Sequence, residues 1–422
     1  MPELHRLTAT EAKRRIEAGT LRPVEFMEAC LERIAAREPT IRAFAYFDPA
    51  RAREAASIAR PGPLHGLPVG IKDILDTADM PTGNGSPIWA GSRPKADAAA
   101  VAWMRAAGGV AIGKTVTTEF ATRKPGPTRN PHNLAHTPGG SSSGSAAGVA
   151  DGFFPLAFGS QTAGSVVRPA AFCGVVGYKP TFGMISRVGA KVMSDSLDTV
   201  GVLARSVADC ALLAAAVSGR ELGDPDRKPG RAPEIGLCRT PVWDHAEPET
   251  ATLLAEVGEI LARAGAHISE RDLPSDFALV EHAHPVVMNT ESARALGWEL
   301  ATAREQISDQ LLERLDFGLA QTDAAIAEAY AVFTRAQAAF PSVMDGLDIL
   351  LTPSAPGVAP EGIGWTGDPV FNFIWTSLHV PCVTVPAGTG RHGLPLGIQI
   401  VARRGEDRAA LAWAQWVAAA LG

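Results

Sequence analysis

Serine and glycine residues gather in two segments of the chain, a combination typical of acyl-transfer sites. The first segment, PGGSSSGSAAGVADG, covers residues 138–152, and the second, GSQTAGSVVRP, covers residues 159–169. A serine hydroxyl becomes a nucleophile when a base lies within hydrogen-bond reach, and glycines before a helix let backbone N–H groups approach a reactive centre. A flexible linker is the alternative interpretation, but a linker would not lie between two strands of a continuing core pattern.

The motif GSSSG at residues 140–144 matches the nucleophile-elbow pattern G-x-S-x-G. This match would make Ser142 the nucleophile, with Asp348 and His379 as candidate partners. An elbow requires a strand that runs into the serine, whereas the preceding NPHNLAHTPGG contains two prolines and no apolar run. His379 lies beside a run typical of a buried strand, where a histidine is more often structural. The context therefore does not favour an elbow.

A second motif, GGVAIGKT at residues 108–115, matches the phosphate-binding pattern G-x-x-x-x-G-K-[ST]. A phosphate loop follows a strand and opens a helix. Here the apolar residues inside the match, Val110 to Ile112, themselves predict the strand. We therefore do not expect nucleotide binding.

Taken together, GGSSSGSAAGVA (139–150) and GSQTAGSVVRPAAFCGVVGYKPT (159–181) resemble the amidase signature family. Further matching segments are PVGIKDILDT, IGKTVTTEF, TRNPHNLAHTPGG, SLDTVGVLARSVAD, DILLTPSAP and GLPLGIQIVA. The resemblance covers nearly the whole chain, is thinnest from about residue 220 to residue 340, and is closest in pattern to malonamidase-like small bacterial amidases.

The resemblance implies a Ser-Ser-Lys triad that cleaves the C–N bond of a small amide through an acyl-enzyme. The nucleophile falls on Ser165, the bridging serine on Ser141 after a cis peptide, and the general base on Lys72. Backbone N–H groups of Thr162, Ala163, Gly164 and Ser165 would form the oxyanion hole, with Ser142 and Ser160 in support. No cofactor and no metal are implied.

A lysine acts as a base only when it is neutral, so Lys72 needs a strongly lowered pKa. Its usual pKa is about 10.4, and burial away from acids must lower this by about three units. The strand-like surroundings of Lys72 make burial plausible. Asp73 follows directly, but neighbours on a strand point to opposite faces, and we expect Asp73 to point away.

The chain departs from the family pattern around the nucleophile. The family often has Asp and Arg where this chain has Gln161 and Val167, respectively, and it usually has Gly where this chain has Ala163. Ser160 keeps a hydroxyl group, which is expected to bond Ser141 or Ser142.

Malonamidase-like members also carry arginine at the place of Arg168. If Arg168 faces the pocket, its planar fork suits a substrate carboxylate; the alternative is that it braces the turn at residues 169–172. Arg123 and Lys124 are further candidates for the border of the pocket.

The elements that must position these residues are expected to be those of an α/β fold, and the resemblance implies a large twisted mixed β-sheet with helices on both sides. Short apolar runs alternate with helical stretches, and the resemblance implies one amidase domain over residues 1–422. Residues 1–60 are expected to form bracing helices, with Thr10 capping the first, and residues 220–345 a mainly helical, substrate-side insertion. The runs expected to be strands are PVGIKDIL, GVAIGKT, FPLAFGS, EIGLCR, DILLTPS, PCVTVPAG and LGIQIVA.

The charge and residue composition of the chain limit the kinds of partner that we expect. The formal net charge of −6 comes from interspersed acids and bases, so neither nucleic acid nor an anionic membrane is expected as a partner. Five well-separated cysteines predict buried thiols in a reducing cytoplasm, and the charged N-terminus does not match a signal peptide. A small-molecule amide is the expected partner, and a homodimer is possible.

Two other functions stay open. One is an amidotransferase-type subunit that releases ammonia from glutamine for a partner protein. The other is a non-catalytic binding protein on the same fold, against which the joint presence of Lys72, Ser141 and Ser165 argues.

Overall fold

One mixed sheet forms the centre of the computed structural model, which describes residues 3–227 and 229–422. Within this part of the chain the sheet has eleven strands in the order β1-β3-β2-β4-β6-β5-β10-β11-β9-β7-β8. The strands are β1 (Phe44–Phe47), β2 (Pro68–Lys72), β3 (Val110–Thr115), β4 (Leu156–Gln161), β5 (Val176–Lys179), β6 (Thr199–Ala204), β7 (Glu234–Leu237), β8 (His267–Glu270), β9 (Ile349–Pro353), β10 (Cys382–Thr389) and β11 (Pro395–Val401).

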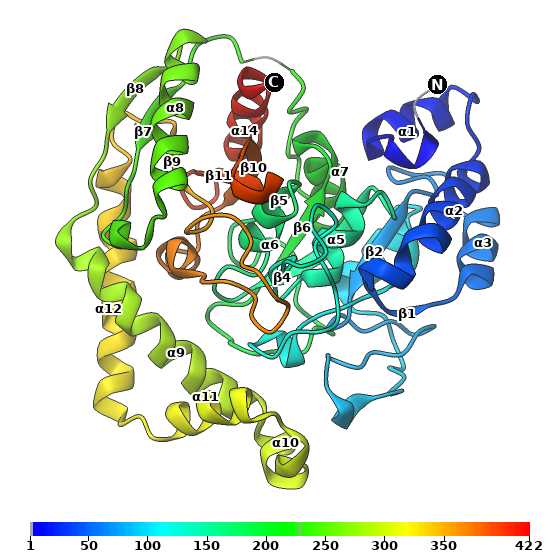
Figure 1. Cartoon of the computed structure of the whole chain (residues 1–422), viewed down its shortest axis with the longest axis horizontal. Coiled ribbons are helices and arrows are strands. Elements are labelled where there is room, and N and C mark those ends of the chain that lie inside the picture. Colours follow the sequence, from blue (N-terminus) through cyan, green and yellow to red (C-terminus); the bar gives the residue numbers. More distant parts are fainter. Residues whose placement is uncertain (1–2, 228) are drawn as a thin grey trace.

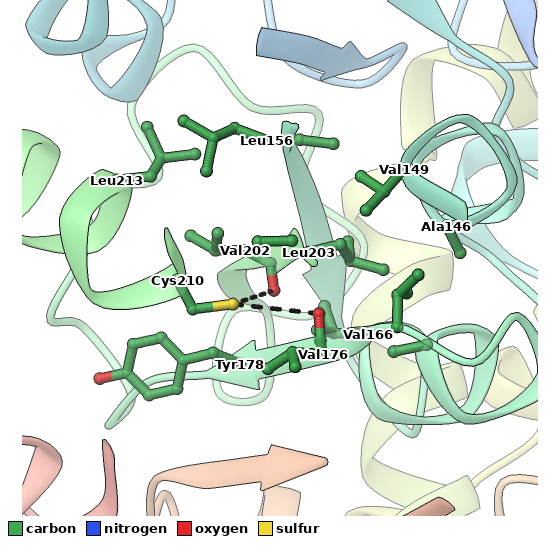
Figure 2. Packing of buried hydrophobic residues seen from close by; sticks show 14 of the residues in the cluster. Ala146, Val149, Leu156, Val166, Val176, Tyr178, Val202, Leu203, Cys210 and Leu213 are labelled. Carbon is green, nitrogen blue, oxygen red and sulfur yellow. Dashed lines mark hydrogen bonds between the residues drawn. The ribbon is translucent and has the colours of Figure 1, made fainter. Parts of the chain in front are cut away.

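Helices cover both faces of this sheet, as expected for the α/β fold. Figure 2 shows side chains of α5 and α7 packing from opposite sides onto the strands that carry Leu156, Val176 and Val202. In Figure 1, α1 to α3 lie at one side of the molecule and α9 to α12 at the other. The helices are α1 (Ala9–Glu17), α2 (Pro23–Ile41), α3 (Pro49–Ser57), α4 (Ala99–Ala106), α5 (Ser143–Ala150), α6 (Val167–Phe172), α7 (Val207–Ser218), α8 (Pro248–Arg263), α9 (Val280–Ala295), α10 (Gly297–Thr302), α11 (Asp309–Leu319), α12 (Asp323–Val343), α13 (Phe373–Ser377) and α14 (Asp407–Leu421).

All seven apolar runs expected to be strands are strands, namely β2, β3, β4, β7, β9, β10 and β11. Four further strands, β1, β5, β6 and β8, were not expected. The physical reason is clearest for β8, an edge strand whose residues are mostly exposed, so that it carries no apolar pattern.

The N-cap of the first helix lies two residues earlier than expected. Thr8, not Thr10, is the N-cap of α1, and its hydroxyl oxygen accepts a hydrogen bond from the backbone N–H of Glu11 at 3.2 Å. The Thr10 hydroxyl instead donates to Asp209 at 3.0 Å, which ties α1 to α7. The prediction of Thr10 as the cap was therefore wrong, because a distant carboxylate takes its hydroxyl.

Strands β2 and β4 are parallel neighbours, and this pairing assembles the polar residues. The carboxyl ends of parallel strands meet at one edge of a sheet, where ligands are usually bound. Here β2 ends at Lys72, and β4 ends with Ser160 and Gln161. The loop at residues 162–166 then leads into α6.

Glycines of the serine-rich segment serve close packing. A Cβ atom on Gly144 in α5 would lie 2.1 Å from the carbonyl oxygen of Ala43 and 2.5 Å from the nitrogen of Val116. Because both neighbours are backbone atoms, neither can turn aside. Gly144 therefore lets α5 approach the chain at Ala43 and Val116 closely.

Three buried or largely buried glutamates tie the helices at residues 280–343 to the rest of the molecule. Glu119, at the end of the loop after β3, accepts hydrogen bonds from Ser308 before α11. Glu291 in α9 accepts from Ser194 and Ser196, and Glu299 in α10 accepts from Trp89 and Lys191. These contacts fix α9 to α11 against the loops that follow the central strands.

All five cysteines are free and buried, as expected. No helix in residues 3–227 and 229–422 has the length and apolar character needed to cross a membrane.

Gly144→Ala should destabilise the protein by about 2 kcal/mol or more, because overpacking against backbone atoms forces α5 to move. Gly297→Ala is the matched control, since its Cβ would meet open space at a backbone φ that any residue adopts, and it should change stability by less than about 1 kcal/mol. Chemical denaturation of both variants measures the difference. Equal stability of the two variants would contradict this account of Gly144.

Candidate active site

The amine of Lys72 lies at the centre of a cluster of serine hydroxyls. The Lys72 side chain is fully buried at the end of β2. Its Nζ lies 2.7 Å from Oγ of Ser141 and 2.8 Å from Oγ of Ser160. The structure therefore brings together Lys72 and Ser141, as expected. It also corrects one expectation, because the Ser160 hydroxyl bonds Lys72 and not Ser141 or Ser142.

Burial lowers the pKa of Lys72 to about 7, and the negative charge of Asp198 opposes this shift only in part. At neutral pH a large share of the Lys72 amine is therefore uncharged. A neutral amine can donate a hydrogen bond to one hydroxyl and accept a proton from another. The cluster can thus withdraw a proton from Ser141.

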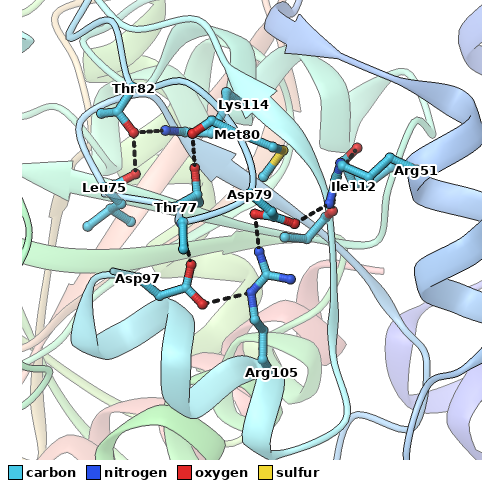
Figure 3. Close-up of polar contacts among 12 residues, drawn as sticks. Arg51, Leu75, Thr77, Asp79, Met80, Thr82, Asp97, Arg105, Ile112 and Lys114 are labelled. Atoms are coloured by element: carbon cyan, nitrogen blue, oxygen red, sulfur yellow. Dashed lines mark hydrogen bonds and ion pairs between the residues drawn. The ribbon is translucent and has the colours of Figure 1, made fainter. Parts of the chain in front are cut away.

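Asp73 points away from Lys72, as expected from the alternation of a strand. Its carboxylate lies 3.2 Å from Nζ of Lys114 and accepts the backbone N–H of Gly83 at 3.1 Å. Lys114 also bonds Thr82, in the polar network drawn in Figure 3. The acid next to Lys72 in the sequence is therefore the counter-ion of a different lysine.

Ser141 and Ser142 lie between β3 and the start of α5. The peptide bond between Gly140 and Ser141 is cis, as the resemblance implied. Ser141 is buried, and Ser142 holds the backbone of Ser160 by donating to its carbonyl oxygen at 3.4 Å and accepting its N–H at 3.3 Å. Ser142 thus supports the strand that carries Ser160.

Ser165 lines a cavity of about 510 Å³ at the end of β4. Thr162, Ala163 and Arg168 line the same cavity. Within the described residues, the backbone N–H groups of residues 162–165 donate no hydrogen bond to the protein. Four consecutive free donors beside a hydroxyl are an arrangement that can bind an oxyanion.

Gly164 and Gln161 shape this loop. A Cβ atom on Gly164 would lie 2.1 Å from Oδ1 of Asn372, so a larger residue at this position would have to displace the Asn372 side chain. Gln161 accepts hydrogen bonds from the N–H groups of Val166 and Val167 at 2.9 and 3.1 Å. A neutral amide therefore braces the loop, and Val167 takes no part in an ion pair.

Arg168 both borders the cavity and braces the chain. Its Nη2 donates to the carbonyl oxygen of Gly140 at 2.7 Å, and its Nε donates to that of Thr366 at 2.9 Å. The side chain is 4% exposed, and its buried Nη1 has no partner among the described residues. Burial lowers the pKa of Arg168 to about 10, against the opposing charge of Asp368, so it stays cationic at neutral pH.

Two more arginines line the cavity, Arg123 and Arg314. Burial, together with the positive charges of Arg123 and Arg168, lowers the pKa of Arg314 to about 9. The expected neighbour Lys124 is exposed and does not line the cavity. Arg314 lies in α11, where one arginine among other charged residues gives no sequence signal.

Neither rejected motif forms the site that its pattern would predict. Asp348 forms an ion pair with Arg231, and His379 bonds the carbonyl oxygen of Ser196 at 2.7 Å, so neither joins Ser142. Residues 110–115 of the GGVAIGKT motif are strand β3, with Lys114 buried. Among residues 3–227 and 229–422, no three His, Cys, Asp or Glu side chains lie close enough together to hold a metal ion.

Comparison with known proteins identifies the family. The model of the family described as Amidase matches residues 25–411. The chain belongs to the amidase signature family. A glutamyl-tRNA(Gln) amidotransferase subunit of Chloroflexus aggregans is 34% identical, over 96% of this chain and 94% of that protein.

Among solved structures, a crystal structure of an amidase has a TM-score of 0.89 at 31% identity, covering 99% of this chain and 100% of the other. 6-Aminohexanoate cyclic dimer hydrolase complexed with substrate has a TM-score of 0.89 at 27% identity, covering 99% of this chain and 97% of that one.

Lys72 should titrate with a midpoint near pH 7, charged below it and neutral above it, because burial disfavours the ammonium. Carbon-13 NMR of lysine Cε in the labelled protein measures this titration, and Lys72→Met assigns the resonance. A surface lysine such as Lys13, paired with Glu17, serves as the internal comparison. A Lys72 resonance that stays charged up to pH 9 would contradict the assignment.

Proposed function

We propose that this member of the amidase signature family hydrolyses the C–N bond of a small amide through an acyl-enzyme on Ser165. The observation that carries the proposal is the buried Lys72 amine at 2.7 Å from Ser141, with a pKa of about 7. Serine needs a base of this kind to attack a carbonyl near neutral pH. Lys72 is the base, and Ser141 is the proton bridge.

The proton path runs from Ser165 through Ser141 to Lys72. As Ser165 attacks the amide carbon, Ser141 takes the Ser165 proton and passes its own to Lys72. The protonated Lys72 then returns a proton by the same path to the leaving nitrogen, which departs as ammonia or an amine. Water repeats the attack on the ester, which restores Ser165 and releases the carboxylic acid.

The free N–H groups of residues 162–165 stabilise the oxyanion formed in each attack. A donor of this type contributes about 3 to 4 kcal/mol to the transition state, because it meets full negative charge only there. The supporting observation is that none of the four groups is used within the described residues.

The substrate is an acidic amide, such as a dicarboxylic acid monoamide or a carboxylated urea. The Nη1 of Arg168 is buried without a partner beside the cavity, and an unpaired guanidinium nitrogen there suits a carboxylate. Arg123 and Arg314 add positive charge to the same cavity. The positive electrostatic potential of the cavity would therefore attract an anionic group on the substrate.

An amidotransferase subunit is the second candidate function. It is favoured by the identity of 34% with proteins of that name, and glutamine is itself an amide with a carboxylate. The two functions differ in what the purified chain does alone. Efficient ammonia release from dicarboxylic monoamides without a partner favours the free-standing hydrolase, whereas release from glutamine that needs a partner favours the subunit.

Replacing Ser165 or Lys72 by alanine should lower kcat for ammonia release by at least about 10³-fold, because each removes a member of one proton path. Ser141→Ala should lower it by about 10² to 10³-fold. For the wild type, kcat/KM should rise with pH and reach half its maximum near pH 7, where Lys72 loses its proton.

Ser145→Ala is the control for these variants. Its hydroxyl is buried in the same serine-rich segment but donates to the carbonyl oxygen of Phe158 at 2.7 Å. This variant should keep kcat within about threefold of the wild type. Full activity of Lys72→Ala, together with loss of activity in His379→Ala, would overturn the mechanism.

Arg168→Met should abolish a preference for malonamate over propionamide. The wild type should favour malonamate by about tenfold or more in kcat/KM, since a charged hydrogen bond is worth about 1.5 to 3 kcal/mol. The ratio of kcat/KM for malonamate to that for propionamide separates carboxylate binding by Arg168 from its bracing of the chain. Loss of the bond to Gly140 would lower kcat/KM for both substrates alike and leave the ratio unchanged.

Arg129→Gln provides the comparison, since Arg129 donates to Leu134 at 2.8 Å and does not line the cavity. It should keep the wild-type ratio. No preference for the acid in the wild type, or an unchanged ratio in Arg168→Met, would exclude Arg168 as the carboxylate-binding residue.

A further inference from the structure

We propose that His284 and Thr376 are positioning residues that orient the oxyanion hole by holding the carbonyl groups of Thr162 and Ala163. This inference rests on the proposed hydrolysis at Ser165. Both residues belong to helices that lie far from the loop in the sequence, His284 to α9 and Thr376 to α13. Neither carries a signal in the sequence.

The His284 ring is fixed on one carbonyl oxygen. Its Nε2 lies 2.9 Å from the carbonyl oxygen of Thr162, and its ring stacks on Phe373 with centroids 4.3 Å apart. The side chain is fully buried, and Nδ1 has no partner among the described residues. Because a carbonyl oxygen only accepts, the proton of the neutral ring must be on Nε2.

His284 stays neutral in this environment. Burial lowers the pKa of His284 to about 4, with the positive charge of Arg314 acting in the same direction and the bond to Thr162 opposing it. A neutral, buried and stacked ring is a fixed donor that does not titrate near neutral pH. It is therefore suited to hold a peptide group in place.

Thr376 holds the next carbonyl group in the same way. Its hydroxyl donates to the carbonyl oxygen of Ala163 at 2.7 Å and accepts the side-chain N–H of Gln161 at 3.0 Å. The hydroxyl proton is thus directed at Ala163. Two consecutive carbonyl groups of the loop are each held by one donor.

Holding a carbonyl group sets the direction of the following N–H group. In a trans peptide the C=O and the N–H of the next residue point in opposite directions within one plane. The bond from His284 therefore orients the N–H of Ala163, and the bond from Thr376 orients the N–H of Gly164. The N–H of Ala163 therefore points away from His284 and the N–H of Gly164 away from Thr376, and both groups are unused within the described residues.

The experiment removes each donor and then restores it. His284→Leu and Thr376→Val should lower kcat by about 10 to 100-fold, with KM changed by less than about threefold, because a misaimed donor weakens the transition state more than the ground state. His284→Gln and Thr376→Ser keep a donor and should recover most of kcat.

Inhibition supplies a second readout. A small alkylboronic acid forms a tetrahedral adduct on serine, and its affinity should fall by the same factor as kcat in His284→Leu and Thr376→Val. Affinity for the product carboxylate, which is planar, should not change. If the substitution only disturbed the structure in general, the affinities for the boronic acid and for the carboxylate would both fall, or neither would.

His379→Leu is the matched control for His284→Leu. His379 also bonds one carbonyl oxygen, that of Ser196 at 2.7 Å, and stacks on Phe182 with centroids 4.2 Å apart. It does not line the cavity, so its loss should lower stability without lowering kcat.

Unchanged kcat in folded His284→Leu, an equal loss in His379→Leu, or no recovery in His284→Gln would overturn the assignment of His284. If His284→Leu does not fold, unchanged kcat in Thr376→Val overturns the inference by itself. A wild type that hydrolyses no amide would overturn the proposed function and this inference together, whereas Ser165-dependent hydrolysis that His284 and Thr376 do not affect would overturn the inference alone.

Discussion

The rest of the site depends on the burial of one amine without a counter-ion. Lys72 ends a strand that is covered on all sides, and removal from water makes its charged form costly. A carboxylate within a few ångströms would restore the charge, yet the pleat of β2 turns Asp73 towards Lys114. Lys72 is left with neutral partners, the hydroxyls of Ser141 and Ser160 and the carbonyl oxygen of Ser160. This environment is the basis for proposing Lys72 as a base at neutral pH.

A second constraint acts on the loop that faces the cavity. Free backbone N–H groups such as those of residues 162–165 tend to bond to any acceptor within reach. They stay free here because other parts of the chain hold the loop through its carbonyl groups and side chains. The holding groups come from separate parts of the chain, because the Thr162 hydroxyl bonds Asp198 at 2.6 Å while α9 and α13 take the carbonyl groups. Helices α9 and α11 also line the cavity, so the same elements border the substrate space and brace the loop.

Prediction from the sequence succeeded for seven of the eleven strands in the described residues, but it missed β5 and β6 although both are fully buried. The strands β2, β3 and β4 are fully buried, and a continuous apolar run marks each of them. It failed at β8, whose exposed edge needs no such run, and at the first helix cap, where Asp209 competes for Thr10. It also missed Arg314, His284 and Thr376, because a single polar residue in a helix has the same appearance whether it faces a cavity or the solvent.

By itself, the sequence determined the family, the class of fold and the candidates Lys72, Ser141 and Ser165, because these lie in long segments whose residue order is distinctive. It also determined that Lys72 and Asp73 point apart, since that follows from the alternation of any strand. Only the tertiary structure decided that Ser160 bonds Lys72, that Arg168 holds Gly140 while leaving Nη1 unpaired, and that three arginines share one cavity. The reason is physical: a hydrogen bond or a field depends on distances between segments far apart in the chain, and residue order does not contain these distances.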